Sequence, residues 1–130
     1  MVTAIASKWN REEISKGVKE VFVDCLGVDD EEVVPTASIS KDLGAESIDF
    51  LDISFRLEKK FEIKVGDRKM FDAQERLSII QQLIELRKPG YKKAEAEIAS
   101  VQAEVDRISV QNVIDYVIKK LREDGRFKGA

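Results

Sequence analysis

Few side chains of this 130-residue sequence could do chemistry. The sequence has no histidine, so it lacks the commonest general base and the commonest metal ligand. Its one cysteine, Cys25, can form neither a zinc site nor an internal disulfide, and it falls on the apolar face of a predicted helix as a buried, inert thiol. The 25 acidic residues are scattered among 22 basic ones, which is typical of solvated helix faces. We therefore expect no catalytic residues, no metal site and no enzymatic activity.

The remaining candidate is the hydroxyl of Ser47, which lies between Asp42 and Asp49. Gly44 supplies backbone freedom for a turn, and Ser47 begins a helical pattern that continues to Phe61. A small polar residue at the start of a helix commonly caps it by accepting a hydrogen bond from a free backbone N–H group. Capping is therefore the simplest role for Ser47, and the helix that follows gives a reason to consider a second one.

The predicted helix behind Ser47 is apolar on two sides. A core-type stripe consists of Phe50, Ile53, Leu57 and Phe61. A second stripe on nearly the opposite side consists of Ile48, Leu51 and Phe55. Charged residues lie along both edges, and a small domain has few layers to cover two faces. The second stripe is therefore predicted to be an exposed docking surface beside Ser47.

The stretch Asp42-Leu43-Gly44-Ala45-Glu46-Ser47-Ile48-Asp49 resembles the signature of acyl carrier proteins, whose usual form is Asp-Leu-Gly-x-Asp-Ser-Leu-Asp. The resemblance continues through Leu57-Glu58-x-x-Phe61-x-Ile63 and is specific over residues 10–65. In that family the serine carries a 4′-phosphopantetheine arm through a phosphodiester, and a separate phosphopantetheinyl transferase adds it. The resemblance therefore implies that Ser47 is the cofactor-binding residue and that the chain is a carrier.

A carrier of this kind holds acyl groups as thioesters on the arm and presents them to acyltransferases or synthases. The resemblance implies a docking strip for these enzymes and for the transferase, made of Glu46, Ile48, Asp49, Leu51, Asp52 and Phe55. It also implies that the acyl tail lies between helices, with candidate wall residues Phe50, Ile53, Leu57, Phe61, Val113 and Val117. All six wall candidates are also ordinary core positions.

The docking helix departs from the strongly acidic pattern of the family, because Arg56, Lys59 and Lys60 interrupt it. Such charges favour dedicated partners over general ones. The sequence looks closest to specialised carriers that hold very long hydroxy fatty acids for lipid A, so specialised fatty acid or lipid biosynthesis is the predicted role. The alternatives are a peptidyl or aminoacyl carrier domain and a cofactor-free helical interaction module.

The fold implied by the resemblance is an all-α, four-helix-type bundle, and we treat residues 1–130 as one domain. Two segments, 76–85 and 107–116, compete for the last helix of the bundle. We favour the second because its apolar face is broader, which makes residues 66–105 an inserted helical hairpin. If the first is the last helix, residues 89–130 form a C-terminal helical extension. Residues 125–130 are expected to be a loose tail.

The composition of the chain places further bounds on partners and location. The net charge of −3 does not suggest a nucleic-acid-binding surface. No apolar run approaches the length of a membrane span, and a single cysteine is compatible with a reducing cytoplasm. We expect a cytoplasmic monomer.

Overall fold

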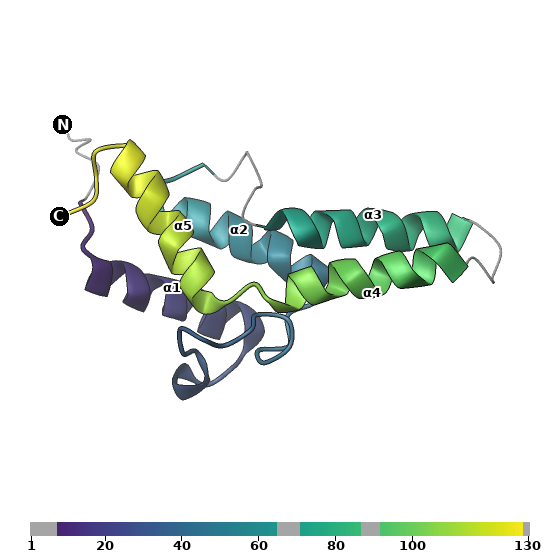
Figure 1. The fold of residues 1–130 in the computed structure, drawn as a ribbon. Coiled ribbons are helices and arrows are strands. Elements are labelled where there is room, and N and C mark those ends of the chain that lie inside the picture. The colour runs from purple at the N-terminus through teal and green to yellow at the C-terminus, as the bar shows by residue number, and fades with distance from the viewer. Residues whose placement is uncertain (1–7, 65–70, 87–91, 129–130) are drawn as a thin grey trace.

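The structure, a computed structural model, describes residues 8–64, 71–86 and 92–128. Within these ranges the regular elements are all helical, which confirms the predicted fold class (Figure 1). The elements in chain order are α1 (Arg11–Leu26), the 3₁₀ turn η1 (Asp30–Glu32), α2 (Ser47–Phe61), α3 (Asp72–Leu86), α4 (Lys92–Asp106) and α5 (Val110–Glu123).

Local sequence signals set both ends of α1. The Asn10 side chain accepts a hydrogen bond from the backbone N–H of Glu13 at 2.8 Å, and the Glu13 carboxylate accepts one from the backbone N–H of Asn10 at 3.0 Å. This reciprocal pair forms a capping box. At the other end, Gly27 adopts a left-handed conformation with φ of 68°, which ends the helix.

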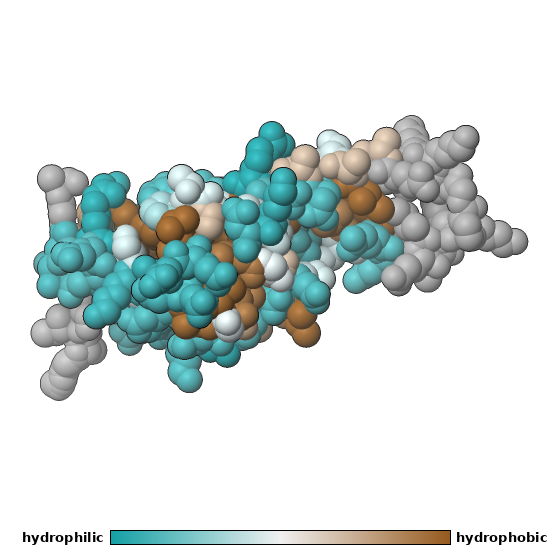
Figure 2. Space-filling view, turned by 90° about the horizontal axis from the view of Figure 1, so that it is seen from below, coloured by the Kyte–Doolittle hydropathy of each residue, from teal (hydrophilic) through white to brown (hydrophobic). Residues whose placement is uncertain are grey.

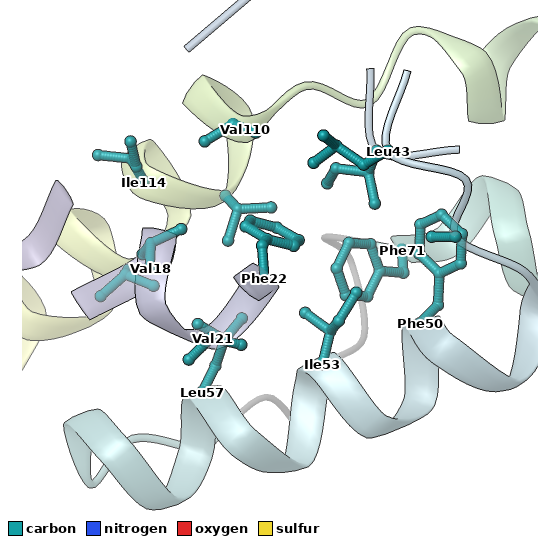
Figure 3. Close-up of a cluster of buried hydrophobic side chains, with 14 of the residues drawn as sticks. Val18, Val21, Phe22, Leu43, Phe50, Ile53, Leu57, Phe71, Val110 and Ile114 are labelled. Atoms are coloured by element: carbon teal, nitrogen blue, oxygen red, sulfur yellow. The ribbon is translucent and has the colours of Figure 1, made fainter. Parts of the chain in front are cut away.

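The core of the bundle lies where α1, α2 and α5 pack together. Phe22 of α1 and Ile53 and Leu57 of α2 are fully buried and point into one cluster (Figure 3). Gly17 of α1 allows a close approach to α2, because a Cβ atom added there would lie 2.7 Å from Cζ of Phe61. The core stripe predicted for α2 is therefore confirmed as a buried face.

Helices α3 and α4 form a hairpin that extends away from this core (Figure 1). A bidentate ion pair joins them, in which the Arg76 guanidinium donates to the two carboxylate oxygens of Glu104 at 2.8 and 3.2 Å.

Helix α5 returns to the bundle and packs on α1. Its N-cap is Ser109, whose hydroxyl accepts a hydrogen bond from the backbone N–H of Asn112 at 3.2 Å. Val113 and Val117 of α5 are completely buried. Residues 110–116 of the predicted segment 107–116 thus belong to a helix whose apolar face is buried in the core.

The expectation of a loose C-terminal tail is wrong for residues 125–128. Arg126 is only 7 % exposed, and its guanidinium donates to the carbonyl oxygens of Phe61 at 2.7 Å and Glu62 at 2.9 Å. The backbone N–H of Trp9 donates to the carbonyl oxygen of Arg126 at 2.8 Å, and the backbone N–H of Lys128 donates to the carbonyl oxygen of Trp9 at 2.7 Å. The tail is ordered because its arginine satisfies carbonyl groups that the end of α2 leaves unpaired.

The surface of one face of the molecule is mainly hydrophilic, with apolar areas over the bundle and over the hairpin (Figure 2). Among the described residues, no helix has the length and apolar character that crossing a membrane requires.

Candidate functional site

Asp42, the first acidic residue of the signature, stabilises a turn in the connection between α1 and α2. The carboxylate of Asp42 accepts a hydrogen bond from the backbone N–H of Ser38 at 2.7 Å, and the Ser38 hydroxyl accepts one from the backbone N–H of Lys41 at 3.1 Å. Backbone bonds tie the same connection to the start of α5: Ile39 donates to Ile108 at 3.0 Å, and Val110 donates to Ala37 at 3.0 Å. The loop before Ser47 is therefore held on the bundle.

The next residues of the signature shape the entry into α2. Leu43 and Ala45 are buried and anchor the chain, whereas Gly44 between them has a φ of 74°. A residue with a side chain rarely adopts that conformation, so a glycine is required for its backbone rather than for space. This alternation leaves Glu46 and Ser47 exposed at the end of the loop.

Ser47 is the first residue of α2, and its side chain is exposed. The prediction that Ser47 caps the helix is wrong, because Glu46 takes the N-cap position and Asp49 supplies the capping carboxylate. That carboxylate accepts a hydrogen bond from the Glu46 backbone N–H at 2.8 Å. In the part of the chain that the structure describes, the Ser47 hydroxyl has no hydrogen-bond partner, so it is available for reaction.

The predicted docking strip lies on the exposed side of α2. Ile48, Leu51 and Phe55 are 72 %, 50 % and 59 % exposed, so the second stripe faces solvent as expected. Glu46 is exposed, whereas Asp49 and Asp52 are half-buried. Asp52 forms an ion pair with Arg56 at 3.2 Å, which reduces the negative charge of the strip.

A groove with a cavity volume of about 240 Å³ lies between α2 and α3, and Ser47 is at its wall. Phe50, Leu51 and Phe55 supply most of the apolar surface from α2. Phe71, immediately before α3, packs against Phe50 edge to face, with ring centroids 4.9 Å apart (Figure 3). The rest of the α3 wall is polar and consists of Gln74, Glu75 and Ser78.

Only Phe50 of the six predicted acyl-wall residues lines this groove. The other five are fully buried core residues: Ile53, Leu57, Phe61, Val113 and Val117. Phe71, Gln74 and Ser78 line the groove but were not predicted from the sequence. The spacing of three and four residues between them is the sequence pattern that could have indicated them, because residues so spaced lie on one face of a helix.

Cys25 is half-buried rather than fully buried as expected, and its Sγ is 3.3 Å from a carboxylate oxygen of Asp52. Burial raises the pKa of the thiol to about 12, and the hydrogen bond and charge of Asp52 add to the effect. The thiol is therefore protonated at neutral pH and is a poor nucleophile, which agrees with the inert role expected of it.

A protein-family model described as a phosphopantetheine attachment site matches residues 16–81. The match covers half of the chain and runs from α1 through α2 into α3, so the chain belongs to this family. No solved structure matches the chain.

The prosthetic group of this family is 4′-phosphopantetheine, and a carrier domain of this kind interacts with the transferase that attaches the group. The residues around Ser47 fit such a group. The hydroxyl is exposed and has no hydrogen-bond partner among the described residues, and it stands at a helix N-terminus, where free N–H groups favour a phosphate. The adjoining groove can receive a flexible chain that begins at Ser47.

Proposed function

We propose that Ser47 is the attachment residue and that the protein is a non-catalytic acyl carrier in specialised fatty acid or lipid biosynthesis. The observation that supports this most strongly is the exposed hydroxyl of Ser47, without a hydrogen-bond partner in the described structure, at the wall of a partly apolar groove. A residue that served only as a cap would direct its hydroxyl to a backbone N–H group, whereas here Glu46 holds the N-cap position and Asp49 accepts from its N–H.

In the attachment step, the Ser47 oxygen forms a phosphodiester, and its proton passes to a base of the transferase. The bond that breaks joins the phosphate to the nucleotide of an activated phosphopantetheine donor. Once attached, the group supplies a terminal thiol that holds an acyl group as a thioester. Tethering raises the effective concentration of that acyl group at each docked enzyme.

The apolar wall of the groove favours an acyl cargo over a charged aminoacyl cargo. Phe50 and Leu51 present apolar surface about one helical turn from Ser47, and Phe55 does so just over two turns away. Removing methylene groups from water is favourable by about 0.8 kcal/mol each, whereas an ammonium group loses solvation in such a site. The five predicted wall residues that lie in the core remain candidates for a deeper pocket.

The exposed strip of α2 is the proposed docking surface for the transferase and for acyltransferases or synthases. Its apolar centre is bordered by Glu46 and Asp49, and a positive partner surface would complement these carboxylates. Arg56 and Lys59 would repel the same partner surface, which supports dedicated partner enzymes.

We also propose that residues 66–105 are an insertion in the carrier bundle. The packing of α5 against α1 supports this, since α5 then serves as the last bundle helix and α3–α4 form the inserted hairpin. The family match ends at residue 81, within α3, and this boundary favours the alternative of a C-terminal extension. Deletion of α3 and α4, with a short linker that joins the ends, tests the insertion against the extension. If the hairpin is an insertion, the remaining bundle should fold and should still be modified.

Intact-mass measurement tests the attachment residue. The chain is co-expressed with a phosphopantetheinyl transferase as wild type, Ser47→Ala and the matched control Ser54→Ala. We expect the added mass of phosphopantetheine on the wild type and the control, and none on Ser47→Ala. An unmodified wild type would favour a cofactor-free interaction module, and a modified Ser47→Ala would assign the attachment to another residue.

Loading of the modified protein tests the cargo. Transfer of saturated acyl chains of increasing length, hydroxyacyl chains and aminoacyl groups is followed by mass spectrometry. Acceptance of long acyl and hydroxyacyl chains is expected. Preferential loading of amino acids would favour the peptidyl carrier alternative.

A further inference from the structure

The groove between α2 and α3 has two chemically different walls. The α2 wall contributes most of the apolar surface, whereas the α3 wall beyond Phe71 is polar. Gln74 is the unusual member, because it is only 7 % exposed although its side chain carries a carboxamide. Burying an amide is costly unless its donors and acceptor are paired.

The carboxamide of Gln74 is only partly paired. Its Nε2 atom donates to the hydroxyl of Ser78, one helical turn further on, at 3.3 Å. Its carbonyl oxygen has no hydrogen-bond partner within the described parts of the chain. A carboxamide has two N–H donors and two acceptor sites, so the pair retains capacity to donate and to accept toward the groove.

The position of this pair relative to Ser47 limits what it can bind. Helices α2 and α3 run in opposite directions and lie side by side near their beginnings, as the packing of Phe50 on Phe71 also shows (Figures 1 and 3). A chain that starts at Ser47 and enters the groove therefore meets the polar wall of α3. The phosphopantetheine arm carries two amide groups, whereas a simple acyl chain has no polar group along its length to pair with a carboxamide.

Given the attachment to Ser47 proposed above, we propose that Gln74 and Ser78 form a binding subsite for the amide groups of the phosphopantetheine arm. The subsite holds the arm in the groove between partner encounters. Phe50 and Phe71 cover the apolar parts of the arm on the same path. The polar wall is held in place mainly by the packing of α3, whose Leu77 is buried in the core.

Nuclear magnetic resonance of the complete holo protein with an isotope-labelled arm tests the subsite, after intact mass has verified the modification. We expect nuclear Overhauser contacts from the arm amide protons to the side chains of Gln74 and Phe71. Hydrogen exchange of those amides should be about tenfold slower than in free phosphopantetheine. Exchange as fast as in the free compound would overturn the proposal, as would protection without any contact to α3.

Variants separate the subsite from general packing. Gln74→Leu keeps the approximate size of the side chain but removes its hydrogen bonds, and Ser78→Ala removes the second partner. Both should return arm exchange close to that of the free compound, whereas Gln82→Leu, an exposed change on the same helix, should leave it protected. Equal exchange in Gln74→Leu and Gln82→Leu would contradict the proposal. An unmodified wild type would instead contradict the attachment itself, so the two failures are distinguishable.

Discussion

The carboxylate of Asp42 accepts a hydrogen bond from the backbone N–H of Ser38 at 2.7 Å, and this bond folds the loop that ends at Ser47. The backbone N–H of Asp42 also donates to the carbonyl oxygen of Ser38 at 2.9 Å, so the two residues close a tight local turn. The first acidic residue of the signature therefore acts by positioning the loop, at a distance of five positions from the serine.

Replacing Asp42 by alanine should lower the free energy of unfolding by about 1–2 kcal/mol, because the Ser38 N–H loses its partner. It should also slow modification of Ser47, since the turn that presents the serine loses a constraint. Urea unfolding and the rate of mass addition measure the two effects. Glu31→Ala is the control, because Glu31 is an exposed acidic residue of the same connection. Equal behaviour of the two variants would refute the positioning role.

Arg126 closes the end of α2 from a position more than 60 residues away in the sequence. Arg126→Met preserves the length of the side chain but leaves the carbonyl groups of Phe61 and Glu62 without these donors. We expect a loss of about 2 kcal/mol in the free energy of unfolding, measured by urea denaturation. Lys128→Met, which changes an exposed charge in the same segment, should cost less than about 0.5 kcal/mol. The assignment fails if the two variants are equally stable.

The predictable and unpredictable parts of the fold differ in the range of the interactions that form them. Asn10 and Ser109 indicate the starts of helices from the sequence alone, because the backbone N–H groups that they bind lie only three residues away. The exposed stripe of Ile48, Leu51 and Phe55 is visible because helical spacing alone determines which residues share a face. Such features depend on local geometry and need no knowledge of the tertiary structure.

The groove and the ordered tail depend on contacts between distant segments, which no local pattern specifies. The polar wall at Gln74 becomes a wall only because α3 lies against the first turns of α2. Arg126 follows a glycine near the end of the sequence, where a loose tail is the usual expectation. The sequence also suggested the wrong N-cap residue for α2. Serine is a preferred N-cap residue and glutamate is not, yet Glu46 is the N-cap and α2 begins at Ser47 itself.

Gly17→Ala distinguishes close packing from helix propensity by the sign of its effect. Alanine favours an exposed helix by about 1 kcal/mol over glycine. At this position its Cβ would lie 2.7 Å from Cζ of Phe61, whose buried ring also packs edge to face on Trp9 at 4.7 Å. We therefore expect a net destabilisation of about 1–2 kcal/mol in thermal or urea unfolding. Lys16→Ala, at an exposed neighbouring position, controls for propensity, and a stabilised Gly17→Ala would show that the ring moves aside freely.

The Cys25 thiol should react slowly with iodoacetamide while the protein is folded. Its pKa is raised from 9.0 to about 12 by burial and by Asp52, so little thiolate forms at pH 9. We expect alkylation at least about a hundredfold slower than in guanidinium-unfolded protein, followed by mass spectrometry. Because the folded pKa is the higher one, the stability linked to this thiol is fully present below pH 9. It is lost as the pH rises from 9 toward 12.

The charge of Asp52 provides a control for that prediction. Asp52→Asn removes a charge that opposes the thiolate, so alkylation of the folded protein should accelerate. Asp24→Asn, an exposed change in the same helix as Cys25, should have little effect. If both variants react at the wild-type rate, burial alone accounts for the raised pKa.

Ile48 is the most exposed of the large apolar residues of the docking strip, at 72 %, and it is adjacent to the proposed attachment residue. Ile48→Ser should lower kcat/KM for the transferase about tenfold, which corresponds to about 1.4 kcal/mol of lost apolar contact in the complex. The unfolding midpoint should stay unchanged because the side chain has little to lose in the free protein. Ile79→Ser makes the same substitution at a 52 % exposed position of α3 and should leave the transferase reaction unaffected. A similar decrease in both variants would place the docking surface across α3 as well, and no decrease in either would remove the α2 strip from the transferase interface.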